Sequence, residues 1–267
     1  MLGMHGIILS NKKTNRGSAM YLRTIQASAL KTIFEVLKDI INDVNVYFEP
    51  TGIKILTLDT ARVTLIHMSM PADNFEEYDC PSEIIAGLNM ANTYKLLKSV
   101  TSNDSLTLRI HDRDVLEIDI ENTVKHSKTS FKLKLMDINE DILEVPEIQM
   151  NLVTTVPSVD FQRITRDMAN LSSNMSIFRH GNTLELSCQG DFADQTTIME
   201  CNSGDTSSRI GNVFSLKYIN MFTKATNLCA SVQILQDSEN SEMPIVFRYS
   251  IANLGDIQFF LAPKVDV

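Results

Sequence analysis

The chain has 267 residues, of which 43% are hydrophobic and 21% are charged, and its formal net charge is −9 at pH 7. This length allows one large domain or two of ordinary size, and the composition is that of a globular chain and excludes a disordered one. No apolar run approaches the roughly 20 residues that cross a bilayer, so we expect a soluble chain with no membrane partner. The acidic balance excludes a protein that coats nucleic acid with its whole surface, but it allows cations gathered on one face.

The first 20 residues combine a short apolar stretch with a basic, polar run, and we expect them to be a flexible extension outside the fold. From residue 27 to 43, apolar residues recur at the three- and four-residue spacing of one helical face. Lys31 and Lys38 lie two turns apart along the opposite stripe. This pattern predicts an amphipathic helix with two exposed cations.

Three later segments repeat this design. They are 92–100 with Lys95 and Lys98, 160–171 with Arg163 and Arg166, and 215–226 with Lys217 and Lys224. A single stripe of this kind is usually a solvated helix face, and Glu35 and Asp39 partly cancel the cations of the first helix. Four copies in one chain favour stripes that are aimed together.

Alternating apolar and polar residues between these helices predict half-buried antiparallel strands. Ser158 is a candidate N-cap of the third helix. Residues 136–149 are acidic and aperiodic, and we interpret them as a connector between domains. Because the order of elements repeats after the connector, the sequence predicts an α+β fold of two similar domains, 21–135 and 150–267.

No motif of the chain would hold a nucleotide, a zinc ion or a catalytic nucleophile. The four cysteines form no Cys-x-x-Cys pair, and we expect them to be buried hydrophobic residues of a reduced protein. The acidic cluster of Asp73, Glu76, Glu77 and Asp79 lacks the glycine and the spacing of a calcium loop, so we interpret it as a solvated loop. We therefore expect no catalytic residue, no cofactor, no metal and no enzyme activity.

Phe-Thr-Lys-Ala-Thr at 222–226 and Leu-Ala-Pro-Lys at 261–264, with shorter motifs between Tyr21 and Lys264, resemble the proliferating cell nuclear antigen (PCNA) family of eukaryotic-type DNA sliding clamps. The resemblance implies a clamp fold, with antiparallel sheets outside and two helices of each domain along the interior of a ring. It also implies a homotrimer that encircles duplex DNA, acts as a processivity factor for DNA polymerase in replication and repair, and needs a clamp loader. Such a protein would work in the nucleus, or in a viral replication compartment.

The resemblance also assigns roles to particular residues. DNA phosphates would be contacted, without readout of sequence, by Lys31, Lys38, Lys95, Lys98, Arg163, Arg166, Lys217 and Lys224. A pocket under the connector would bind the clamp-binding peptides of partners through Leu58, Arg62, Leu65, Leu143, Val145, Pro244, Phe260, Ala262 and Pro263. Residues 127–135 of one subunit would pair with residues 192–200 of the next and close the ring.

Three features depart from the family pattern. They are the extension before Tyr21, the lack of a lysine in the turn 178–182 where the family's ubiquitin acceptor falls, and the lack of an acidic tail after Lys264. They would suit a diverged eukaryote or a large DNA virus. The nearest alternative is a subunit of a heterotrimeric checkpoint-type clamp, and a more distant one is a DNA-modifying enzyme of two α+β domains.

Overall fold

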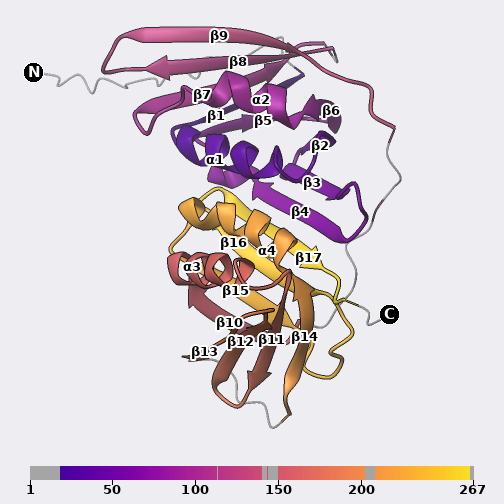
Figure 1. The fold of residues 1–267 in the computed structure, drawn as a ribbon. Helices are drawn as coiled ribbons and strands as arrows, with labels where there is room; N and C mark the ends of the chain where they lie inside the picture. Colours follow the sequence, from indigo (N-terminus) through magenta and orange to yellow (C-terminus); the bar gives the residue numbers. More distant parts are fainter. Residues whose placement is uncertain (1–18, 113, 140–142, 144–149, 202–207, 265–267) are drawn as a thin grey trace, which may run out of the picture.

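The computed structural model describes residues 19–112, 114–139, 143, 150–201 and 208–264. Its two halves follow one plan, in which strands flank two helices (Figure 1). The helices are α1 (Ala27–Leu37), α2 (Met90–Leu97), α3 (Ser158–Ala169) and α4 (Leu216–Phe222), with the short 3-10 helices η1 (Ala72–Asn74) and η2 (Thr223–Leu228). None of the helices in the described part of the chain is long and apolar enough to cross a membrane.

The strands are short, and each pairing between them is antiparallel. Those of the first half are β1 (Met20–Thr24), β2 (Asp43–Glu49), β3 (Gly52–Leu58), β4 (Thr64–Pro71), β5 (Glu77–Asp79), β6 (Ile84–Asn89), β7 (Asp104–Ile110), β8 (Val115–Asn122) and β9 (Ser127–Lys134). Those of the second half are β10 (Leu152–Pro157), β11 (Asn174–His180), β12 (Thr183–Gln189), β13 (Asp194–Glu200), β14 (Ile210–Ser215), β15 (Ser231–Gln236), β16 (Ile245–Ile251) and β17 (Gly255–Leu261).

The strands form three sheets, and one of these joins the two halves. A five-stranded sheet has the order β5-β1-β7-β8-β9, and a four-stranded sheet has the order β13-β12-β11-β14. The eight-stranded sheet has the order β10-β15-β16-β17-β4-β3-β2-β6, and it passes from one half to the other where β17 pairs with β4. The two halves therefore share one continuous sheet, as Figure 1 shows at β4 and β17.

The helices form a single layer on one side of the sheets (Figure 1). Within it, α1 contacts α2 and η2, while α3 contacts α4 and η2. The helices are held there by apolar side chains that belong to the hydrophobic core, such as Leu30 and Ile33 of α1 and Phe161 of α3. Burying each such side chain contributes about 1.5–3 kcal/mol, and the polar faces of the helices are left on the outer side of the layer.

The start of the third helix differs from the prediction. Ser158 was expected to be the N-cap of the third helix, but this was wrong, because Pro157 precedes α3 and Ser158 is its first residue, with no capping hydrogen bond from a side chain. Strand β10 runs directly into the helix, which leaves no separate cap position. The cap that the structure does show is at α2, where the Asn89 side chain accepts a hydrogen bond of 2.9 Å from the N–H of Asn92.

The limits of the predicted extension and of the acidic loop also change. Met20 was placed in the extension, but it is fully buried in β1, so the fold begins earlier than predicted. The interpretation of the acidic cluster as a solvated loop was wrong for residues 77–79, which form β5 against β1. Glu76 just before this strand accepts a hydrogen bond of 2.9 Å from the N–H of Ile25, so its carboxylate has a structural partner.

The four cysteines are all free thiols. Cys80, Cys188 and Cys201 are buried, as expected for small hydrophobic residues, while Cys229 is half-buried. Burial raises the pKa of the three buried thiols above the usual value for cysteine. These thiols are therefore un-ionised at neutral pH and serve as packing groups.

Candidate DNA-facing helix layer and peptide pocket

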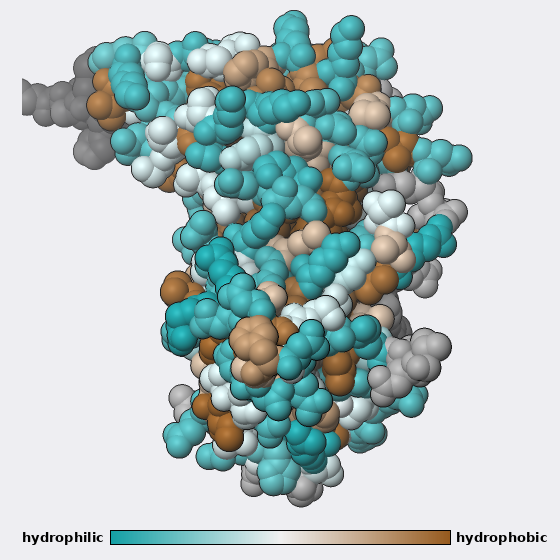
Figure 2. Space-filling model, viewed as in Figure 1, coloured by the Kyte–Doolittle hydropathy of each residue, from teal (hydrophilic) through white to brown (hydrophobic). Residues whose placement is uncertain are grey.

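The eight cations predicted to contact DNA all belong to the helix layer. Lys31 lies in α1 and Lys38 caps its C-terminal end, while Lys95 lies in the last turn of α2 and Lys98 caps the C-terminal end of that helix. In the second half Arg163 and Arg166 lie in α3, Lys217 in α4 and Lys224 in η2. Six of the eight are exposed, while Lys31 and Lys38 are half-buried. Figure 2, which views this face, shows many hydrophilic side chains across it.

The two half-buried lysines both contact the protein itself. The Lys31 Nζ donates a hydrogen bond of 3.0 Å to the carbonyl oxygen of Val100. The Lys38 Nζ lies 2.8 Å from a carboxylate oxygen of Asp39 and 5.2 Å from the centroid of the Tyr94 ring. Both ammonium groups are thus held near the surface of the layer.

Among the exposed cations, Arg163 has only long contacts. Arg163 lies 3.8 Å from a carboxylate oxygen of Asp160 and 3.8 Å from one of Asp167, both on the same helix. Ion pairs this long between exposed side chains contribute little to stability and are screened by salt. Arg163 therefore keeps most of its capacity to bind an external anion.

One contact on this face was missed by the sequence reasoning. Asp39 was expected to offset the charge of its own helix, but α1 ends at Leu37, and the Asp39 carboxylate binds both Lys38 and Lys224 of η2. Lys224 comes from the other half of the chain, 185 residues away in sequence. Only the folded arrangement of α1 and η2 brings these groups together, so no local pattern could have shown the contact.

The predicted peptide pocket contains a cavity of about 280 Å³. Its lining residues are Thr57, Leu58, Asp59, Thr60, Arg62, Asn139 and Leu143, so three predicted residues are brought together. The loop after β3 is shaped by the buried Asp59, whose carboxylate accepts hydrogen bonds of 2.7 Å from the N–H groups of Val63 and Thr64. Arg62 has a positive φ of 56°, a conformation held by this loop.

The other predicted pocket residues lie at different places. Leu65 on β4 is the partner of Leu58 on one side and of Phe260 on the other, so these three continue the pocket wall across β3, β4 and β17. The N–H of Ala262 bonds to the carbonyl oxygen of Val63 at 3.3 Å, which brings the segment with Pro263 next to the loop. Pro244 instead lines a separate small hollow, and Val145 lies outside the described residues.

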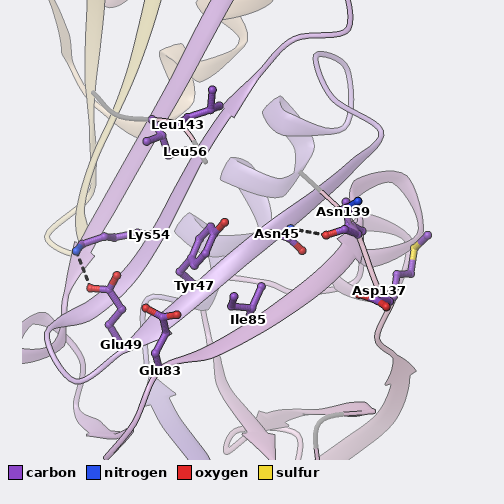
Figure 3. Close-up of a pocket in the computed structure, with 12 residues that line it drawn as sticks. Asn45, Tyr47, Glu49, Lys54, Leu56, Glu83, Ile85, Asp137, Asn139 and Leu143 are labelled. Carbon is purple, nitrogen blue, oxygen red and sulfur yellow. Dashed lines mark hydrogen bonds and ion pairs between the residues drawn. The ribbon is translucent and has the colours of Figure 1, made fainter. Parts of the chain in front are cut away.

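A larger groove of about 600 Å³ adjoins this cavity on the outer face of the eight-stranded sheet (Figure 3). Its lining residues are Asn45, Tyr47, Glu49, Lys54, Leu56, Glu83, Ile85, Met136, Asp137, Ile138, Asn139 and Leu143. Asn139 and Leu143 line both hollows, so the start of the connector passes over the two of them. The floor is apolar at Leu56 and Ile85, and Ile85 is 50% exposed.

Gly87 is the residue of the sequence that indicates where the connector lies beside this groove. The connector is fixed by hydrogen bonds from the N–H of Met136 to the carbonyl of Gly87 at 2.9 Å and from the Asn45 amide to the carbonyl of Ile138 at 3.0 Å. A Cβ atom at Gly87 would lie 2.2 Å from the carbonyl oxygen of Met136. Glycine is therefore required where the connector meets β6.

The strands predicted to join neighbouring subunits are both edge strands. β9 ends the five-stranded sheet and β13 ends the four-stranded sheet. Near or on β13, Phe192 is 79% exposed and Ile198 is 65% exposed. Two lysines of β9 have carboxylate partners on β8, since Lys128 lies 2.9 Å from Asp119 and Lys132 lies 3.0 Å from Glu117.

Comparison with known proteins agrees with this geometry. The family model for the N-terminal domain of proliferating cell nuclear antigen matches residues 20–143, and the model for the C-terminal domain matches residues 144–264. A protein of Paramecium bursaria Chlorella virus 1 named "Probable DNA polymerase sliding clamp 1" is 35% identical over 258 residues, which cover 91% of this chain and 96% of that protein. The proliferating cell nuclear antigen of Chaetomium thermophilum is 32% identical over 254 residues, covering 91% of this chain and 97% of its own length. Both halves of the chain, with their antiparallel sheets and shared helix layer, thus belong to the proliferating cell nuclear antigen family.

Proposed function

We propose that this chain is a DNA sliding clamp, a processivity factor that encircles duplex DNA and tethers DNA polymerase and other replication and repair proteins. Family membership and the names of its viral and fungal relatives support this function. The observation that carries it is the continuous helix layer. This layer holds, on its face away from the sheets, the eight cations that are predicted to contact DNA. Contacts with phosphates carry no sequence information, so a ring lined in this way can hold any duplex.

The ring is a homotrimer in this proposal. β9 and β13 lie at the edges of different sheets, so β9 of one copy can pair with β13 of the next and repeat this contact around a closed ring. Each edge offers unpaired backbone groups, and the exposed Ile198 would be buried by the pairing. Because closure links the ring to DNA topologically, each phosphate contact can be weak. The net charge of −9 supports the same view, since it disfavours DNA on the outer surface.

The pocket beneath the connector is the proposed docking site for partner peptides. Leu58, Leu65 and Phe260 offer an apolar wall from three adjacent strands, and Leu143 reaches over it from the connector. The adjoining groove extends this surface across β3, β2 and β6 and carries carboxylates at Glu49 and Glu83 (Figure 3). Tethering needs binding alone, so this function requires no catalytic group. A clamp loader that opens the ring would place it at sites of DNA replication.

Retention on DNA of different topology tests the proposal. The purified full chain is expected to have the mass of a trimer by size exclusion with light scattering. Once placed on nicked circular DNA by a clamp loader, the ring should stay bound at high salt and leave when the circle is cut. Equal retention on circular and cut DNA would contradict encirclement, and a monomer that needs other chains to form a ring would favour the heterotrimeric alternative.

A further inference from the structure

One carboxylate links two predicted DNA contacts from different domains. Lys38 donates to Oδ1 of Asp39 at 2.8 Å, and Lys224 of η2 donates to Oδ2. The exposed fraction of the side chain is 29% for Asp39, 24% for Lys38 and 46% for Lys224. These groups thus lie at the surface of the helix layer, where a passing phosphate could reach the lysines.

The position of Asp39 is unfavourable for α1 itself. It follows the C-terminal end of the helix, where the unpaired carbonyl groups give a partial negative charge and favour cations. Lys38 suits this position, whereas an acid there is destabilising unless it has other partners. Lys38 and Lys224 are those partners. Asp39 therefore stabilises the pair of lysines and does not stabilise the helix.

The carboxylate remains charged in this setting. Partial burial alone would raise the pKa of Asp39, but the hydrogen bonds and charges of Lys224 and Lys38 outweigh it and lower the pKa. The ammonium groups of the two lysines repel each other, and the negative charge of the carboxylate between them offsets this repulsion. The ionised Asp39 therefore keeps both close together across the boundary between α1 and η2.

We propose that Asp39 is a positioning residue for sliding, which holds Lys38 and Lys224 side by side and competes with DNA phosphates for both. This inference rests on the proposed function of the chain as a sliding clamp. Each lysine exchanges between Asp39 and a phosphate as the duplex moves, so its contact with DNA stays short. The carboxylate lowers the friction between the ring and the duplex while keeping the cations in place.

The chain offers a charge-matched control on the same layer. Asp167 on α3 lies 3.8 Å from Arg163 and is exposed, and among the described residues it pairs with no cation of the other domain. Asp39→Asn and Asp167→Asn remove the same single negative charge from each subunit. Asp39→Glu keeps the charge and serves as the conservative variant.

Diffusion of single fluorescent rings on stretched DNA, at several salt concentrations, measures the predicted effect. At low salt we expect Asp39→Asn to slow diffusion about threefold, the change that follows when a contact gains the energy of a surface ion pair. Asp167→Asn should slow it less than half as much, and Asp39→Glu should stay near the wild type. Equal slowing by Asp39→Asn and Asp167→Asn would overturn the proposal, because net charge would then explain both. An unchanged or faster Asp39→Asn ring would also overturn it.

A second pair of variants covers the case in which Asp39→Asn does not assemble. Lys224→Gln removes one cation and leaves Asp39 to Lys38 alone, so two phosphate contacts weaken. Lys217→Gln removes one exposed cation from the adjacent helix and weakens only one. Diffusion should therefore speed up more in Lys224→Gln, and equal effects would overturn the proposal. Failure of the sliding-clamp function is separate, since a wild-type ring would then not be retained on circular DNA at all.

Discussion

Single side chains stabilise the edge strand β9 as well as the helix layer. Asp119 on β8 is only 5% exposed, and its carboxylate lies 2.6 Å from Arg109 and 2.9 Å from Lys128. Its burial would raise its pKa, but the hydrogen bond from Ser130 and the two cations lower the pKa to about 2. The group thus ties β9, a proposed ring-closing strand, to β7 and β8.

The depressed pKa of Asp119 predicts a pH dependence of stability. The charged carboxylate stabilises the fold above its ordinary pKa of 3.8, and this contribution is lost as the pH falls from about 4 towards 2. Asp119→Asn should lower the free energy of unfolding at pH 7 by about 2 kcal/mol and by much less near pH 2. Urea unfolding of both proteins across this range measures it, and a difference that does not change with pH would contradict the assignment.

Leu143 gives a second prediction at this scale, because it lines both hollows beneath the connector. If partner peptides bind in the smaller cavity, Leu143→Ala should weaken the binding of a clamp-binding peptide about tenfold or more, from the lost burial of its side chain. Ile85→Ala alters only the larger groove, so its effect on affinity measures what that groove adds to peptide binding. Calorimetric titration of both variants measures the two affinities, and wild-type affinity in Leu143→Ala would reject the pocket.

At the scale of elements, periodicity predicted most of the helices and strands but not the residues at which they begin and end. The helices were found because apolar side chains such as Leu30 and Ile33 repeat with the helical period. Their ends depend on competition with neighbours: β10 extends to Pro157, and η2 tightens the chain after Phe222. The short strand β5 had no alternating pattern, and its pairing with β1 depends on a partner more than 50 residues away. Local pattern carries no information about such a partner.

The edge strand β13 predicts how the ring could be broken without unfolding the subunit. Ile198 is 65% exposed in the single chain, so Ile198→Lys should leave the fold intact but place a charge in the proposed pairing with β9. The mass in solution should fall from that of a trimer to that of a monomer. Ile25→Lys, at a position that is 59% exposed before α1, should remain trimeric. A trimer of Ile198→Lys would place the subunit contact elsewhere.

For the molecule as a whole, sequence patterns alone could indicate two domains but not how they join. The residues of β4 and β17 do not indicate that these strands pair and make one eight-stranded sheet, because both have the ordinary alternating pattern of a strand. The resemblance to a known family supplied the pocket residues, yet Pro244 lies in a different hollow from Leu58 and Leu143. Charge patterns in the sequence have the same limit, since they could not show the ion pair of Asp39 and Lys224, which joins the two domains.

The distribution of charge over the whole ring leads to the last prediction. Lys95 and Lys98 belong to the helix layer, whereas Arg209 lies just before β14 and Lys125 in the turn before β9, and all four are exposed. Lys95→Glu with Lys98→Glu therefore changes the net charge by the same amount as Arg209→Glu with Lys125→Glu. Only the first pair should reduce loading onto DNA and polymerase stimulation, by about tenfold at low salt, with a shallower salt dependence because fewer phosphates are contacted. Light scattering should show that both double variants remain trimers. An equal loss in both would mean that net charge alone governs loading, and a loss confined to the outer pair would place DNA on the sheets.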